Sequence, residues 1–149
     1  MTKIFLLSII MILNCMSYAM ASDRFIKKLK LASGQTAVIS EGEFEARSLG
    51  SFSVRLYQAA PAKDETTFFI SGLISARDGF IERVMLSDIN GDTQQEIIVV
   101  VRSVGTGSYL SAHAFTIDDG GQNLTQISIV EGLQPESDPV SALKKFGSK

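Results

Sequence analysis

Cysteine, tryptophan and histidine are nearly missing from this 149-residue sequence, which has one cysteine, no tryptophan and one histidine. The cysteine, Cys15, lies in the apolar N-terminal segment, so the chain after that segment has no thiol for a disulfide, a thiolate metal site or a nucleophile. Without tryptophan, an aromatic platform for sugars would need tyrosine and phenylalanine. These absences predict a domain that is stabilised by its core alone.

A strong excess of charge is also missing. The chain has 14 Lys and Arg residues against 16 Asp and Glu residues, for a net charge of −2. No basic patch suggests nucleic acid or an anionic membrane surface as a partner. We therefore predict that the protein binds no nucleic acid and, once its leader is removed, no membrane.

The first residues have the pattern of a cleaved export signal. Lys3 is followed by the apolar run "IFLLSIIMIL", and Ala19-Met20-Ala21 fits a small-x-small cleavage site. The pattern predicts a signal peptide at 1–21 and a periplasmic mature domain at 22–149. The mature chain would have 13 basic and 16 acidic residues and a net charge of −3.

Cys15 offers an alternative interpretation of this segment as a lipoprotein signal, with the cysteine acylated. The residue before it is Asn14, where that signal has a small side chain. A plain signal-peptide residue therefore fits the sequence better.

Alternation of apolar and polar residues dominates the mature chain, with turn residues between the segments. The expected strands cover 25–31, 35–40, 44–48, 51–58, 66–75, 79–89, 96–103, 109–117 and 124–130. Phe52, Val54 and Leu56 should face the core, because side chains alternate between the faces of a strand. The run "IIVVV" is apolar at every position and predicts a central strand.

The segment "SDPVSALKKF" predicts a short C-terminal helix, with Asp138 as its N-cap and Pro139 in the first turn. No internal repeat or long linker divides the chain. We therefore expect an all-β fold: a single antiparallel β-sandwich or barrel-like domain of about eight strands, with one short terminal helix.

A catalytic constellation is hard to find. His113 lies within an expected strand, where a lone histidine is more often a packing residue than a base. The sequence has no Gly-x-Ser-x-Gly elbow, phosphate loop or histidine metal motif. A pair of glycosidase carboxylates can come from anywhere in a sequence, and nothing singles one out. We predict that the protein is not an enzyme.

The segment "DINGDTQQE" has the sharpest chemical spacing. Asp88, Asn90, Asp92 and Glu96 place oxygen ligands at positions 1, 3, 5 and 9 around a glycine, as calcium prefers. The spacing resembles the calcium loops of FG-GAP-type repeats, apart from Thr93 where a glycine is usual. The alternative is an Asn-Gly turn whose polar side chains cap backbone amides, with no cofactor.

The segment "SVGTGSY" interrupts two strands with glycine and hydroxyl residues. Gly105 and Gly107 allow unusual backbone angles, and Tyr109 suits an interface better than a bare solvent tip. This composition favours a protruding functional loop, whose candidate residues are Ser103, Gly105, Thr106, Gly107, Ser108 and Tyr109. Ser111 and His113 are candidate rim contacts on the following strand.

The stretch "DINGDTQQEIIVVVRSVGTGSYLSAHAF", behind a signal peptide, resembles the bacterial periplasmic inhibitors of I-type (invertebrate-type) lysozyme. Related inhibitors of c-type lysozyme have a Ser-Gly-x-x-Tyr loop, whereas this chain keeps a hydroxyl three positions before the tyrosine, at Thr106. The resemblance implies that Thr106 and Tyr109 enter the cleft of an I-type lysozyme and so protect peptidoglycan from hydrolysis.

The sequence leads to two further expectations, on assembly and on an alternative function. Edge strands and the Phe-rich segment 66–75 would support a homodimer, as the resemblance also implies for some family members. The alternative function is a calcium-stabilised module of the cell envelope that uses the loop 88–96 and binds cell-wall glycan or a surface partner.

Overall fold

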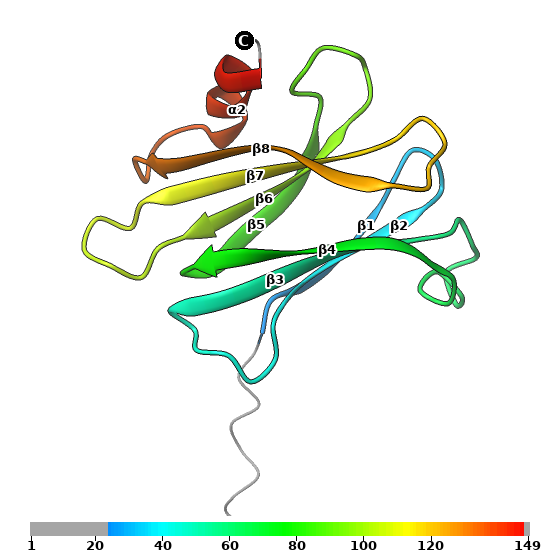
Figure 1. The fold of residues 1–149 in the computed structure, drawn as a ribbon, viewed down its shortest axis with the longest axis horizontal. Helices are drawn as coiled ribbons and strands as arrows, with labels where there is room; N and C mark the ends of the chain where they lie inside the picture. The colour runs from blue at the N-terminus through cyan, green and yellow to red at the C-terminus, as the bar shows by residue number, and fades with distance from the viewer. Residues whose placement is uncertain (1–23, 148–149) are drawn as a thin grey trace, which may run out of the picture.

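The computed structural model describes residues 24–147, so the predicted signal peptide lies outside the described residues. Two four-stranded antiparallel sheets face each other, and one helix lies beside the second sheet (Figure 1). The elements are β1 (Ile26–Lys30), β2 (Thr36–Glu41), β3 (Leu49–Tyr57), β4 (Phe69–Asp78), β5 (Phe80–Ser87), β6 (Glu96–Arg102), β7 (Leu110–Ile117), β8 (Leu124–Leu133) and α2 (Pro139–Gly147). The predicted all-β sandwich with a terminal helix is confirmed.

Within each sheet, strands that follow one another along the chain are neighbours in space. The first sheet has the order β1-β2-β3-β4 and the second the order β5-β6-β7-β8. The chain crosses from one sheet to the other at Gly79, whose φ is +117°. A Cβ atom there would lie 1.9 Å from the carbonyl oxygen of Arg102, so only glycine fits this corner.

The main core lies between the two sheets. Phe52, Val54 and Leu56 of β3 are fully buried, as their alternation predicted. Phe52 and Phe115, one from each sheet, meet edge to face with ring centroids 6.1 Å apart. Burial of aromatic and aliphatic area of this kind is the main stabilising contribution in a chain without disulfides.

Strand β6 is apolar at every position from Ile97 to Val101 because both of its faces are covered. Val99 lies in the core between the sheets, while Ile98 and Val100 pack in a second core with Leu143 of α2. The helix begins as expected: the Asp138 carboxylate accepts hydrogen bonds from the backbone N–H groups of Val140 and Ser141 at 3.2 and 3.1 Å.

The predicted strand at 44–48 is wrong. Residues 42–48 form a loop of turns and bends, in which Phe44 has a φ of 61° and a fully exposed side chain. The Glu45 carboxylate explains part of the difference, because it accepts hydrogen bonds from the backbone N–H and hydroxyl of Ser51, at 2.6 and 2.7 Å. These bonds pull the segment against the start of β3 rather than into a ladder.

None of the helices in the described part of the chain has the length and apolar character that crossing a membrane would require.

Candidate functional site

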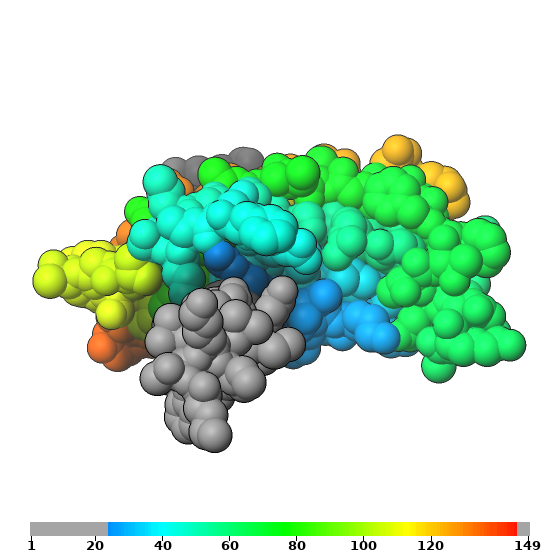
Figure 2. Space-filling view, turned by 90° about the horizontal axis from the view of Figure 1, so that it is seen from below, coloured from blue at the N-terminus to red at the C-terminus, as the bar shows by residue number. Residues whose placement is uncertain are grey.

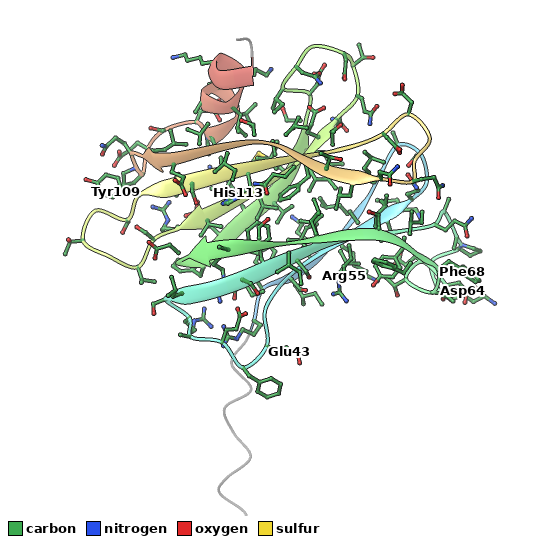
Figure 3. All side chains as sticks on the ribbon, in the orientation of Figure 1. Glu43, Arg55, Asp64, Phe68, Tyr109 and His113 are labelled. Carbon is green, nitrogen blue, oxygen red and sulfur yellow. The ribbon has the colours of Figure 1, made fainter. Side chains whose placement is uncertain are left out.

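The loop 103–109 joins β6 to β7 and extends from one end of the sandwich (Figures 1 and 3). Residues 104–109 are exposed, including the apolar Val104 at 53% and Tyr109 at 44%. Exposed apolar and aromatic side chains at a loop tip are typical of a protein-binding surface. The structure therefore brings all six predicted loop residues together on one projection.

Hydrogen bonds within the loop define its shape. The N–H of Ser103 donates to the carbonyl of Tyr109 at 2.9 Å and closes the base of the loop. The N–H of Ser108 donates to the carbonyl of Gly105 at 3.2 Å and closes a turn at the tip. Thr106 and Gly107 are the two central residues of that turn, so the exposed Thr106 lies at the tip of the loop.

Gly107 and Tyr109 form a tight local contact. Gly107 has a φ of +117°, and a Cβ atom on it would lie 2.6 Å from Cε2 of the Tyr109 ring. The ring therefore rests against the backbone of the turn. Gly105 differs, because nothing lies within 4 Å of a Cβ atom built there.

Arg102 and Glu82 hold the base of the loop. The guanidinium of Arg102 pairs with the Glu82 carboxylate and donates a further hydrogen bond, 3.0 Å long, to the carbonyl of Ser108. Charged partners strengthen such hydrogen bonds. The loop is thus tied to β5 and β6, which lowers the entropy lost when it is ordered against a partner.

Two further segments lie beside this loop. A Cβ atom on Gly79 would approach Cα of Ser103 to 2.8 Å, and the N–H of Gly79 donates to the carbonyl of Ser48 at 2.9 Å. The loop 42–48 and the corner at Asp78 and Gly79 therefore share one end of the molecule with the loop 103–109. Sequence reasoning missed this grouping.

Arg77 holds these segments in place although it is 1% exposed. Its guanidinium donates to the carbonyls of Ala46, Arg47 and Ser51, at 3.1, 2.8 and 3.1 Å, and also to that of Gly79. A buried charge is stable only when its donors are satisfied in this way. In β4, Arg77 follows the uncharged run from Phe69 to Ala76, and a charge at the end of such a run was the available signal.

The side chain of His113 is only 5% exposed, so the structure does not place it on the exposed rim of the loop, where the sequence predicted it. Its ring meets Phe52 edge to face at 5.1 Å. Ser75 Oγ donates to Gln126 Oε1 at 3.2 Å, which leaves Gln126 Nε2 to donate to His113 Nδ1 at 3.2 Å. The imidazole proton is therefore assigned to Nε2.

Burial lowers the pKa of His113, and the negative charge of Glu131 opposes this shift. Ser111, the other predicted rim residue, is half-buried. Both side chains line a cavity of about 670 Å³ at the same end of the sandwich as the loop. They are neighbours of the site rather than part of its projecting surface.

The loop between β5 and β6 brings Asp88, Asn90, Asp92 and Glu96 together, but their oxygens already have partners. Asp88 accepts hydrogen bonds from the N–H groups of Gly91 and Thr93 at 2.6 and 3.0 Å, which lower its pKa. Asn90 Oδ1 accepts from Asp92 N at 3.0 Å, and Asp92 Oδ1 accepts from the N–H of Gln94 at 2.7 Å.

Glu96 is fully buried and accepts a hydrogen bond from Ile89 N at 2.9 Å. Burial raises its pKa. The Asn90 side chain turns its NH2 group toward Asp92 and donates a hydrogen bond to that carboxylate at 2.9 Å. Calcium binds oxygen ligands, so this NH2 group would not be a ligand. Within residues 24–147 no group of three or more His, Cys, Asp or Glu side chains could hold a metal ion. These hydrogen bonds are the ones expected of the amide-capping turn.

Comparisons with known proteins agree on one relationship. A family model described as periplasmic lysozyme inhibitor of I-type lysozyme matches residues 23–146. The crystal structure of such an inhibitor from Aeromonas hydrophila is 48% identical, with a TM-score of 0.75, and the match covers 80% of this chain and 98% of that one. The Aeromonas hydrophila inhibitor in complex with Meretrix lusoria lysozyme gives 48% identity, a TM-score of 0.73, and coverage of 80% and 95%. None of the curated proteins compared matches the chain.

Proposed function

The chain belongs to the family of periplasmic inhibitors of I-type lysozyme, and from this premise we propose that its loop 103–109 enters the substrate groove of the enzyme. The protein is an inhibitor and not an enzyme, and I-type lysozyme is its partner. The relative from Aeromonas hydrophila has been solved with a lysozyme bound. The observation that carries the proposal is the exposed, internally hydrogen-bonded loop with Thr106 at its tip and Tyr109 on its flank.

The chemistry of the target suits this loop. Glycoside hydrolases use acidic side chains on either side of the bond that is cut, within a groove shaped for sugar. The hydroxyls of Thr106 and Tyr109 can donate to such carboxylates. A hydrogen bond to a charged group contributes about 1.5–3 kcal/mol, so two of them are a substantial part of a tight interface.

Tyr109 adds apolar area to these hydrogen bonds. Truncation of a tyrosine that is central to an interface commonly costs at least about 2 kcal/mol of binding free energy. Gly107 lets the Tyr109 ring rest against the turn, which keeps the tip of the loop narrow. Filling the groove excludes the glycan and thereby protects peptidoglycan.

The test is inhibition of cell-wall lysis by the purified mature protein. We expect inhibition of an I-type lysozyme and a weaker effect on a c-type enzyme. In the double variant Thr106→Ala, Tyr109→Ala, we expect inhibition to fall by about 30-fold or more, which corresponds to the loss of about 2 kcal/mol.

Thr125→Ala is the matched control, because Thr125 is an exposed threonine on β8, outside the loop. We expect this variant to inhibit like the wild type. A folded double variant with undiminished inhibition would refute the role of the loop while leaving the family unchanged.

A further inference from the structure

The outer face of the first sheet, which points away from the second sheet, contains a groove. The strand register places Ile26, Ser40, Ser53 and Ile74 in one row across β1, β2, β3 and β4. The two serines in the middle are small, while the isoleucines at the two edges are 68% and 78% exposed. The row therefore has a low polar floor between two apolar walls.

The neighbouring row extends this groove. Arg55 of β3 pairs with Gly72 of β4, which has no side chain to fill the space beside the guanidinium. The ring of Phe69 lies over Gly72, 3.2 Å from the position that a Cβ atom would take, and Tyr57 packs against that ring. The hollow has a volume of about 640 Å³, within the range of small-molecule sites. Figure 2 looks onto the side of the molecule formed by this sheet.

Two arginines line the groove, and each has a buried nitrogen without a partner. Arg55 Nη2 donates to Ser40 Oγ at 3.2 Å, but Arg55 Nε has no acceptor. Arg24 donates through Nη2 to the carbonyl of Glu45, but Arg24 Nη1 has none. Among the described side chains, these two nitrogens are the buried polar atoms left unpaired. Buried donors normally have a partner, so their shared location indicates a missing acceptor.

The acidic residues of the groove do not supply that acceptor. Glu41 is buried and accepts a hydrogen bond from the N–H of Ile81, at 2.7 Å, on the side of the core. Glu43 lies at the exposed rim, in the loop that follows β2 (Figure 3). The groove thus combines two guanidinium groups, two carboxylates that leave the unpaired nitrogens without an acceptor, and serine hydroxyls with apolar walls.

We propose that this groove binds a single-chain amphiphile with an anionic head group, of which a fatty acid is the simplest example. The head group accepts hydrogen bonds from Arg24, Arg55 and the serine hydroxyls. The chain lies along Ile26, Ile74 and Phe69. The groove is on the face of the first sheet, and none of the residues that line it belongs to the loop 103–109, which extends from the end of the second sheet.

The test is an NMR titration of the mature protein, observed through its backbone amides, with dodecanoate kept below its micelle concentration. We expect saturable shifts at Ile26, Gly72 and Ile74, and a Kd at least about tenfold lower than that of dodecyl maltoside, which has the same chain and a neutral head. The variant Arg55→Gln should weaken dodecanoate binding by about tenfold or more. Lys63→Gln removes the same charge from a residue outside the groove and should leave the Kd unchanged.

Three results would overturn the proposal. Equal affinity for the two amphiphiles, or for the wild type and a folded Arg55→Gln variant, would show that the arginines recognise no anion. Shifts confined to other parts of the protein would place binding elsewhere. Broadening of the same amides with protein concentration alone would assign this face to a second copy of the chain. Inhibition of lysozyme at saturating dodecanoate should be unchanged, so the result is independent of the function of the loop.

Discussion

Gly105 and Gly107 stand two positions apart in the loop 103–109, yet their surroundings differ. A Cβ atom on Gly107 would meet the Tyr109 ring at 2.6 Å, and the φ of +117° disfavours any other residue. We expect Gly107→Ala to displace the ring and to weaken inhibition by about tenfold or more, since Tyr109 is the apolar contact that we propose for the interface. The measurement is the inhibitor concentration that halves lysis, together with the melting temperature of the variant.

Gly105→Ala is the control for this prediction. Nothing lies within 4 Å of its new Cβ atom, so inhibition should stay close to that of the wild type. Equal loss in both variants would show that the loop needs flexibility rather than a fixed position of the ring.

His113 gives the fold a dependence on pH. Its pKa is lowered from the ordinary 6.5, chiefly by burial, so the unfolded chain binds the proton more readily than the folded one. The free energy of unfolding should therefore fall as the pH drops below 6.5, until the pKa of the folded state is reached. Denaturant unfolding of the wild type and of His113→Gln across this range would measure the effect, with a flatter profile expected for the variant.

Glu131 provides an independent check, because its negative charge raises the pKa of His113 against the effect of burial. In Glu131→Gln the pKa should be lower still, so the loss of stability at acid pH should become larger. An unchanged profile in both variants would mean that other groups set the pH dependence.

At the scale of elements, the connection between β5 and β6 has two opposed interpretations, a calcium-binding loop and an amide-capping turn. The oxygens of Asp88 and Asp92 accept hydrogen bonds from amides of the same loop, so the turn is stabilised without a bound ion. We expect the melting temperature to differ by less than about 1 °C between millimolar calcium and a chelator, because a ligand that is not bound does not stabilise the fold. A rise of several degrees in calcium, lost in Asp92→Asn, would contradict this expectation.

The strands show what alternation can predict. It identified β3 and β6 because a period of two, or an unbroken apolar run, reports directly how many faces of a strand are buried. It failed at 44–48, where "FEARS" alternates but the Glu45 carboxylate bonds to the start of β3 instead. Competition between a side chain and the ladder for backbone N–H groups depends on three-dimensional proximity, and the sequence alone does not show it.

At the scale of the whole molecule, one part of the candidate site could be predicted from the sequence and another part could not. The loop 103–109 was predictable because glycine, hydroxyl and tyrosine residues are concentrated within seven positions. The neighbouring segments at 42–48 and 78–79 were not, because they reach the same end of the sandwich only through the crossover at Gly79 and the four carbonyls that Arg77 binds. That these segments and the loop 103–109 form one surface becomes apparent only when the pairing of the strands is known.

The whole chain also yields a prediction about its processing and its stability. Cleavage after Ala21 would remove Cys15, the single cysteine, so the mature protein should start at Ser22 and have no thiol. A core built by two sheets, without disulfides, should then unfold in one reversible transition with the same midpoint in the presence and absence of a reductant. Intact mass and N-terminal sequencing of the exported protein would identify the cleavage site. A mass increased by acyl chains, with the protein in the membrane fraction, would instead show that Cys15 is retained and lipidated.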